Sequence, residues 1–255
     1  MPLSPAEKEK TFRMNLDITK YNIRAKIRNP ARIAVVADLH NGRWQEIFAE
    51  IKKNGCDIIV IPGDLTEGMR ACENGLAFLR AASSFAPTFY SIGNHEIGSR
   101  ERYLPLARET GAVVLDNAYV RWHDINIGGL TTGFDARQGF LAKTPAPNLH
   151  WLSMFNALGG YKLLLCHHPE YYPRYIRSTG IDLTISGHAH GGQWRIGGKS
   201  IFAPGQGFFP KYAQGLHEKR LCVSRGLANN AAFPRLGNNP ELVFITLVPE
   251  ENLHR

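Results

Sequence analysis

Five apolar runs, each ending in small or polar residues, constrain the fold of this 255-residue chain more than any other feature of its sequence. A run without apolar–polar alternation is typical of a strand buried on both faces, as in a parallel sheet. We therefore expect each run to be a buried strand that opens into a loop at its carboxyl end. The runs are IAVVADLH at 33–40, IIVIPGDL at 58–65, TFYSIGNHE at 88–96, KLLLCHHP at 162–169 and DLTISGHAH at 182–190.

The segments between the first three runs predict helices. RWQEIFAEIKKNG (43–55) and MRACENGLAFLRAASSF (69–85) space their apolar residues as a helix packed on a sheet does. Strands that alternate with helices form βαβ units. The first half of the chain is therefore expected to be βαβαβ with a parallel sheet.

The rest of the chain indicates a second sheet. YVRWHDINIGGLTT (119–132) is typical of a β-hairpin, and LCVSRG (221–226) and ELVFITLV (241–248) indicate late strands. Near the N-terminus, ITKYNIRAKI (18–27) alternates apolar and polar residues, which predicts a half-buried antiparallel strand. The stretch 197–215, rich in Gly and Pro, is expected to be a long surface loop.

Composition bounds the domain count and the partners. A chain of this length with 44% hydrophobic residues can bury a complete core, and no repeat or linker divides it, so we predict a single domain over residues 1–255 with a motif core at about 31–248. The formal charge of +8 favours anions: phosphate esters, nucleic acid or an anionic membrane surface. The four cysteines show no CxxC spacing and are expected to be buried packing residues.

The first residues, MPLSPAEKEK, are charged and lack an apolar run of signal-peptide length. No stretch of eighteen apolar residues follows later in the sequence. These features predict a cytoplasmic protein without a signal peptide or a transmembrane segment.

Polar side chains suited to metal binding follow all five runs. Side chains at the carboxyl ends of parallel strands gather at one edge of a sheet, where such folds place their active sites. Carboxylate, carboxamide oxygen and imidazole together suit Mn, Fe or Zn, whereas sites made only of oxygen suit Mg or Ca. The candidates are Asp38 and His40, Asp64, Asn94 and His95, His167 or His168, and His188 and His190.

Two of these motifs have i, i+2 spacing. In Asp38-Leu39-His40 and His188-Ala189-His190, an extended backbone points both polar side chains the same way, toward one site. Taken singly, the motifs have ordinary structural explanations: Asp64 follows Pro62-Gly63 as in an Asx turn, and Asn94 follows Gly93 as in a left-handed turn. Their occurrence after five successive strands favours a metal site.

The motifs DLH, GD, GNHE, H-x-P and GHAH, in this order, resemble the calcineurin-like metallophosphoesterase superfamily. GGQWRI, SRGLANNAAFPRLGNNPE and a closing apolar strand are similar to its branch of YkuE/YaeI-type bacterial phosphodiesterases. The implied fold is a four-layer α/β/β/α sandwich of two mixed sheets flanked by helices. This agrees with the two sheets expected above.

The resemblance also implies two divalent metal ions and a ligand set. His95 would stand beside the metal pair without binding it. The family pattern H-x-P assigns the ligand role to His167, because Pro169 follows His168. One metal would be held by Asp38, His40 and His190, the other by Asn94, His167 and His188, and Asp64 would bridge both.

A two-metal centre predicts in-line attack on phosphorus by a metal-bridging hydroxide, because the metals lower the pKa of water and clamp the phosphoryl oxygens. His95 is predicted to donate a proton to the leaving group, since an imidazole titrates near neutral pH. The expected enzyme hydrolyses a phosphodiester, a pyrophosphate or a monoester, with lipid-linked or cell-envelope compounds among its substrates.

Three alternatives accompany this prediction. A nuclease or nucleotide phosphodiesterase of the same superfamily has the same motifs. A non-enzymatic nucleic-acid-binding module would need a basic helix or an aromatic RNA platform, and neither is recognisable. A phosphate-binding P-loop at 192–200 has one residue too many and no helix after it.

Other residues have roles that the sequence leaves open. Arg225 and Arg235 are candidates for a supporting or substrate-facing role or for a scaffold role. The clusters YYPRY (171–175) and FFPKY (208–212) combine aromatic residues with cations, which suits peripheral contact with a lipid headgroup interface. The alternative is that both clusters are partly buried loop cores.

Overall fold

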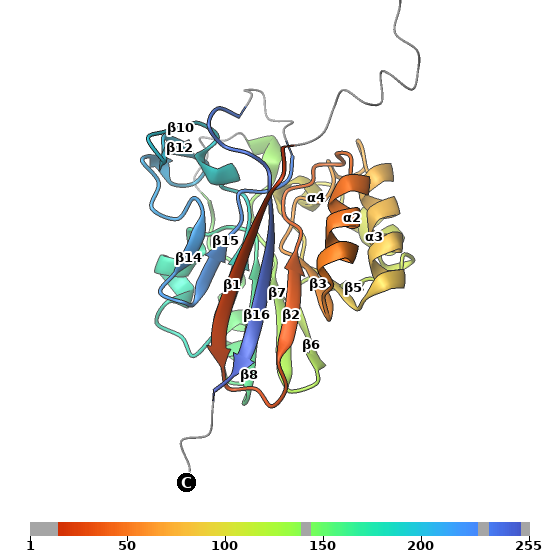
Figure 1. Ribbon diagram of the computed structural model, residues 1–255, viewed down its shortest axis with the longest axis vertical. Helices are drawn as coiled ribbons and strands as arrows, with labels where there is room; N and C mark the ends of the chain where they lie inside the picture. The colour runs from red at the N-terminus through yellow and green to blue at the C-terminus, as the bar shows by residue number, and fades with distance from the viewer. Residues whose placement is uncertain (1–14, 139–143, 229–234, 251–255) are drawn as a thin grey trace, which may run out of the picture.

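The computed structural model describes residues 15–138, 144–228 and 235–250. Its first sheet has six strands in the order β1-β16-β2-β3-β4-β5 (Figure 1). Strands β2 to β5 are parallel, and β16 runs antiparallel to β2. The bounds are β1 (Asp17–Ala25), β16 (Glu241–Pro249), β2 (Ala31–Val35), β3 (Ile58–Ile61), β4 (Thr88–Tyr90) and β5 (Val113–Val114).

The second sheet also has six strands, in the order β14-β15-β9-β8-β7-β6. Its four central strands are parallel, and the two edge strands are antiparallel to their neighbours. The hairpin predicted at 119–132 is confirmed as β6 and β7. The bounds are β14 (Gly215–His217), β15 (Leu221–Val223), β9 (Leu183–Ser186), β8 (Tyr161–Cys166), β7 (Ile125–Leu130) and β6 (Ala118–Trp122).

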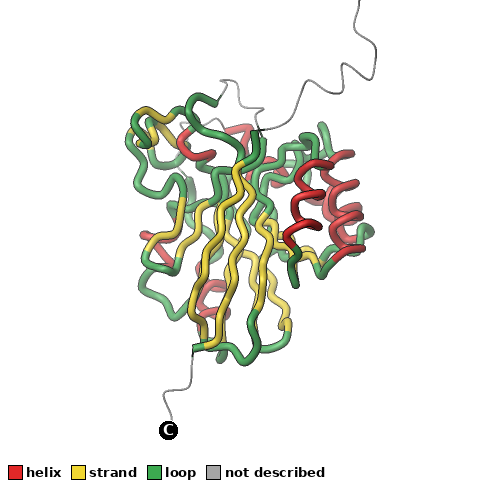
Figure 2. The backbone as a smooth tube through the Cα atoms, in the orientation of Figure 1, coloured by secondary structure: helices red, strands yellow, loops and turns green. Residues whose placement is uncertain are grey.

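Helices cover the outer faces of the sheets. The two helices predicted in the first half are confirmed as α2 (Gln45–Asn54) and α3 (Glu73–Phe85), and Figure 2 shows them side by side beside the first sheet. The remaining helical segments are α4 (Asn94–Ile97), α5 (Arg100–Arg108), η1 (Ala136–Gln138), α6 (Leu149–Asn156), η2 (Tyr172–Ile176) and η3 (His190–Gly192).

Three apolar cores separate four layers. Along β2, Ile33 and Val35 belong to the core between the two sheets, whereas Ala34 belongs to the core beneath α2 and α3. A third core lies on the outer side of the second sheet, where Trp151 and Phe155 of α6 pack. Burial on both faces explains why the strands of the site are continuous apolar runs. The α/β/β/α sandwich of two mixed sheets is confirmed.

The antiparallel pairing predicted for residues 18–27 is wrong. Strand β1 is an edge strand that pairs parallel to β16, with Asp17 opposite Glu241 and Ala25 opposite Pro249. Alternation of apolar and polar residues reports that one face of a strand is buried. The alternation carries no information about the direction of the neighbouring strand. Here that neighbour is β16, which lies more than 200 residues later in the chain.

The stretch 197–215 is more regular than the surface loop predicted for it. It contributes to two short hairpins, β10 (Arg195–Ile196) with β11 (Lys199–Ser200), and β12 (Phe202–Ala203) with β13 (Gly207–Phe208). Lys199 and Ser200 lie in a strand and not at the start of a helix, so the P-loop alternative is wrong.

Some expectations fall outside the described residues: those for the charged N-terminal segment and for residues 229–234 of the SRGLANNAAFPRLGNNPE motif. Within the described ranges, no helix combines the length and the apolar character that crossing a membrane requires. Cys72, Cys166 and Cys222 are buried, as predicted, and Cys56 is partly buried. The single domain over 1–255 stays a prediction.

Candidate metal centre and active site

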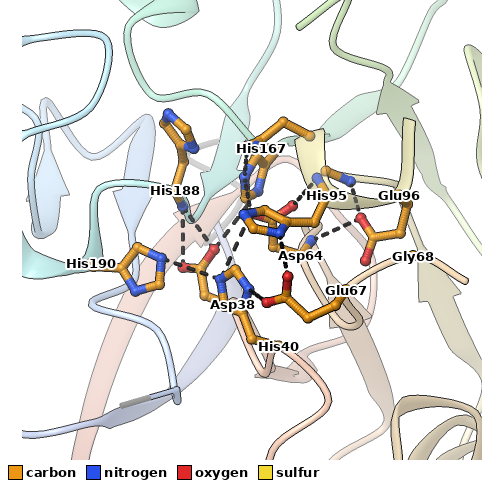
Figure 3. A network of polar contacts seen from close by, with 12 residues as sticks. Asp38, His40, Asp64, Glu67, Gly68, His95, Glu96, His167, His188 and His190 are labelled. Carbon is orange, nitrogen blue, oxygen red and sulfur yellow. Dashed lines mark hydrogen bonds and ion pairs between the residues drawn. The ribbon is translucent and has the colours of Figure 1, made fainter. Parts of the chain in front are cut away.

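All five predicted motifs meet at one edge of the molecule (Figure 3). They follow parallel strands of both sheets, β2, β3 and β4 of the first sheet and β8 and β9 of the second. Because both sheets present the carboxyl ends of these strands at this edge, residues far apart in the sequence come together. The donor atoms of Asp38, His40 and His190 lie within 4.8 Å of one another, and so do those of Asp64, His167 and His188.

In the first of these groups, Nε2 of His40 lies 3.3 Å from Nε2 of His190. Burial and the neighbouring His40 hold the pKa of His190 well below its ordinary value, which keeps this imidazole neutral. Neutral imidazole is the form that binds a metal.

In the second group, Nε2 of His167 lies 3.1 Å from Oδ2 of Asp64 and 2.9 Å from Oδ1 of Asn94. Burial lowers the pKa of His167, but Asp64 outweighs it and raises the pKa to about 9. Burial and His168 hold the pKa of His188 well below its ordinary value. The second group thus consists of the carboxamide of Asn94, the imidazoles of His167 and His188, and the carboxylate of Asp64.

Asp64 connects the two groups. Its Oδ2 lies 3.1 Å from His167 on one side and 3.8 Å from Nε2 of His40 on the other. The side chain is buried, so its charge must be compensated by protons or cations. A mixed set of oxygen and imidazole donors around a shared carboxylate fits two divalent cations of borderline hardness.

The extended backbone predicted for the two i, i+2 motifs is wrong. Asp38, His40, His188 and His190 have φ values of 51°, 48°, 65° and 47°, which is the left-handed region. Non-glycine residues occupy this region at an energetic cost and are held there by their surroundings. The backbone N–H of His188, for example, donates to Oδ1 of Asp38 at 3.0 Å. Tight turns, and not strand alternation, aim these side chains.

Two glycines allow the ligands to approach each other. A Cβ atom on Gly93 would lie 2.2 Å from Oδ1 of Asp64, and one on Gly63 would lie 2.6 Å from Nδ1 of His167. Both distances are far below van der Waals contact. Glycine at these positions is therefore a steric requirement of the site.

Sequence reasoning missed Glu67. One oxygen of its carboxylate accepts a hydrogen bond from Nδ1 of His40 and the other accepts one from Nδ1 of His95, both at 2.8 Å. Because an ionised carboxylate only accepts, both imidazoles carry their proton on Nδ1, which leaves Nε2 of each directed to the centre. The signal in the sequence was a carboxylate three residues after Asp64.

Glu67 and Asp64 together set the charge of His95. Burial alone lowers the pKa of His95, but the charge of Asp64 and the hydrogen bond to Glu67 outweigh it and raise the pKa to about 9. Burial alone raises the pKa of Glu67, but hydrogen bonds from His40 and His95 hold it well below its ordinary value. His95 is therefore protonated at neutral pH in the protein without metal.

Glu96 was also missed, although it is part of the GNHE motif. It is buried, and its carboxylate accepts hydrogen bonds from the backbone N–H groups of Gly93 at 2.7 Å, Thr66 at 2.9 Å and Asp64 at 3.2 Å. It thereby ties the loop after β3 to the loop after β4. Its function is to hold these two loops in register.

The side chains of the His167-His168 doublet diverge. His167 faces Asp64, whereas Nδ1 of His168 lies 3.1 Å from Oε1 of Glu170. The His168 ring packs against His188 with ring centroids 4.0 Å apart. Glu170 also accepts a hydrogen bond from Oγ1 of Thr144 at 2.8 Å. His168 thus lies behind the His188 ligand candidate.

A cavity of about 160 Å³ opens beside the centre. His95 lies at its edge with a side chain that is 29% exposed, whereas the Asp64 side chain is 2% exposed. Its outer wall is formed by residues that sequence reasoning did not single out, namely Phe134, Ala136, Thr144, Pro204 and Gly205. These side chains are uncharged, so the wall offers shape and not ion pairing.

The two arginines take different places. Arg225 forms ion pairs with Asp17 at 2.8 Å and Glu241 at 3.4 Å, which ties the loop after β15 to β1 and β16. Arg235 lies beside the centre, with Nη2 3.4 Å from Nδ1 of His190 and Nε donating to the carbonyl of Ala228 at 2.7 Å. Arg225 is a scaffold residue, and Arg235 adjoins the site.

Comparison with known proteins gives the following matches. The model of the family described as calcineurin-like phosphoesterase matches residues 31–192. YpbG of Bacillus subtilis is 27% identical over 234 residues, covering 87% of this chain and 83% of that protein. Phosphodiesterase YaeI of Escherichia coli is 27% identical over 241 residues, covering 86% and 83%. The crystal structure of TT1561 of Thermus thermophilus aligns with a TM-score of 0.44 at 16% identity, over 62% of this chain and 82% of that one.

Proposed function

We propose that this chain, which belongs to the calcineurin-like phosphoesterase family, hydrolyses phosphodiesters at a centre of two divalent metal ions. Metal-dependent hydrolysis of phosphoesters is the activity of the family. The observation that carries the two-metal proposal is the position of Asp64, between His167 at 3.1 Å and His40 at 3.8 Å. The name of the YaeI relative supports a diester as the first substrate class to test.

The proposed ligands divide into two sets that share Asp64. The contacts that support this division are the convergence of His40 with His190 and of His167 with Asn94. The donor types favour Mn, Fe or Zn. The first set is Asp38, His40, His190 and Asp64, and the second is Asn94, His167, His188 and Asp64.

When bound, two such cations neutralise the phosphoryl oxygens and lower the pKa of the attacking water. The protein itself orients the reaction. His95 is proposed to protonate the leaving oxygen. It lines the cavity, and the hydrogen bond from its Nδ1 to Oε2 of Glu67, 2.8 Å long, holds the ring in place. The uncharged wall of the cavity borders the place where His95 lies.

A nuclease or nucleotide phosphodiesterase of the same superfamily has the same centre and stays the alternative. Pyrophosphates and monoesters remain within the reach of such a centre, because the ligands recognise only the phosphoryl group. We also propose that the whole chain forms one catalytic domain, since its sheets share a continuous core between them.

The test is a substrate panel with the protein loaded with Mn, Fe or Zn. We would compare bis(p-nitrophenyl) phosphate, p-nitrophenyl phosphate, a lipid-linked pyrophosphate and single-stranded DNA. Faster hydrolysis of the diester than of the monoester, abolished by a chelator and restored by metal, is the expected result. Activity that persists after metal removal would overturn the proposal. Asp64→Asn should lose this hydrolysis, because Asp64 is the proposed shared ligand, whereas Glu101→Gln, an exposed change on α5, should keep it.

A further inference from the structure

Large apolar side chains are exposed on the two short hairpins β10–β11 and β12–β13. Phe208 is 75% exposed, Phe209 is 72% exposed and Ile196 is 68% exposed. The Phe208 ring is supported by the ring of Phe202 at a centroid distance of 5.5 Å. The backbone N–H of Phe209 donates to the carbonyl of Ile201 at 2.8 Å. These aromatic residues are held outward by the hairpins that carry them.

Cations lie directly beside these apolar side chains. Lys199 and Lys211 line one surface hollow together with Phe209. No Asp or Glu occurs between Asp182 and Glu218, so the whole segment that builds the hairpins carries only positive charge. Aromatic tips beside lysines, with no acidic residue among them, are complementary to an anionic lipid surface. We call Ile196, Lys199, Phe208, Phe209 and Lys211 the hairpin surface.

The hairpin surface is continuous with the active-site cavity. The turn of the β12–β13 hairpin contains Pro204 and Gly205, which form part of the cavity wall. Figure 1 shows β10 and β12 at the end of the molecule toward which β2 points, where the motif loops lie. One hairpin therefore presents its turn to the proposed catalytic centre and its aromatic residues to the outside.

We propose that the hairpin surface docks on an anionic lipid bilayer, with Ile196, Phe208 and Phe209 entering the interface and Lys199 and Lys211 contacting the headgroups. Docking in this way places the cavity at the level of the headgroup phosphates. The substrate class that follows is a phosphoester carried by a membrane lipid. This last step rests on the proposed function, whereas docking itself does not.

The second aromatic cluster, 171–175, does not take part. Tyr171 and Tyr172 are buried in the core outside the second sheet, so for them the loop-core alternative holds. Within the other cluster, Tyr212 is buried as well, and its ring lies 5.5 Å from Nζ of Lys211. Of the aromatic residues in the two clusters, Phe208 and Phe209 are proposed to face the lipid, because they are the strongly exposed ones.

Co-sedimentation of the full chain with vesicles tests the docking without requiring activity. Metal-free protein would be mixed with phosphatidylcholine vesicles, with or without phosphatidylglycerol, at low and at moderate salt. We expect binding to the anionic vesicles only, weakened by salt. Removing Lys199 and Lys211 by substitution with Gln should lower binding at low salt about five-fold for each charge. Lys52→Gln with Lys53→Gln, on α2, is the control of equal charge.

The apolar part is tested by Phe208→Ser with Phe209→Ser, compared with Met154→Ser on α6, which is also exposed. The phenylalanine variant should lose at least about ten-fold in vesicle binding, while its thermal unfolding midpoint and its hydrolysis of a soluble diester stay near those of the parent. Equal losses in the control variants, or no binding of the parent to anionic vesicles in either buffer, would overturn the proposal. Binding of single-stranded DNA that depends on the same residues, in place of vesicles, would overturn it too.

Discussion

His95 donates its Nδ1 proton to Glu67 at 2.8 Å, so its Nε2 is the nitrogen that can face a substrate. The geometry predicts that Glu67 controls both the orientation and the charge of His95. Removal of the negative charge in Glu67→Gln should lower activity about 10-fold to 100-fold, the range typical of partners that orient a metal site. The pH profile of kcat should move to lower pH, because the hydrogen bond to Glu67 and its negative charge both raise the pKa of His95. An unchanged profile would contradict this role.

His95→Asn should affect substrates unequally. A general acid assists poor leaving groups most, so we expect a loss of about 100-fold to 10,000-fold with alkyl or sugar esters and a much smaller loss with nitrophenyl esters. Bound metal should stay near that of the parent. Both rates and metal content would be measured on one preparation, with His150→Asn on α6 as the control. Equal losses across leaving groups would argue against proton donation, and loss of metal would make His95 a ligand.

The histidine doublet gives a prediction about metal content. His167→Ala should lose metal and activity, because Nε2 of His167 lies 3.1 Å from Asp64. His168→Ala should keep both metals, since His168 faces Glu170 and packs behind His188. Elemental analysis of the two variants after identical metal loading decides between them. The reverse result would transfer the ligand role to His168.

Metal loading of the parent chain should reach about two transition-metal ions per chain. Asp64→Asn should lower the occupancy of both sites, because Asp64 lies within reach of His167 and His40. Substitution of His167 or of His40 by Ala should mainly lower the occupancy of one site. Titration followed by elemental analysis measures these occupancies. A stoichiometry near one for the parent would contradict the two-metal centre. Loss of only one of the two metals in Asp64→Asn would contradict the shared carboxylate.

The Glu67–His95 pair should also make the stability of the metal-free protein depend on pH. The depressed pKa of Glu67 adds stability above its ordinary value, about 4.3, that is lost as the pH falls. The pKa of His95, raised to about 9, adds stability that is complete below about 6.5 and lost toward pH 9. The difference in Tm between parent and Glu67→Gln should therefore be largest between about pH 4.5 and 6.5. Thermal unfolding with chelator present checks this, and a constant difference would count against the pair.

The sequence by itself determined the layers of this protein and the positions of its motif residues. The runs that became β2, β3, β8 and β9 are mostly apolar because nearly every position of these strands is buried, and this requirement is local to the strand. Polar residues at the ends of parallel strands lie at one edge of their sheet, so the approach of Asp38 to Asp64 followed from the parallel direction of β2 and β3. The contact of Asp64 with His167 needed more, because these residues follow strands of different sheets.

Only the tertiary structure decided which surfaces face each other. The parallel pairing of β1 with β16, the left-handed backbone at Asp38 and the double contact of Glu67 all depend on residues distant in the chain. The clusters at 171–175 and 208–212 have nearly the same composition, yet Tyr171 is buried and Phe208 is exposed. The sequence of each cluster shows that it combines aromatic and basic side chains. Whether these side chains are buried depends on which other residues the fold packs against them.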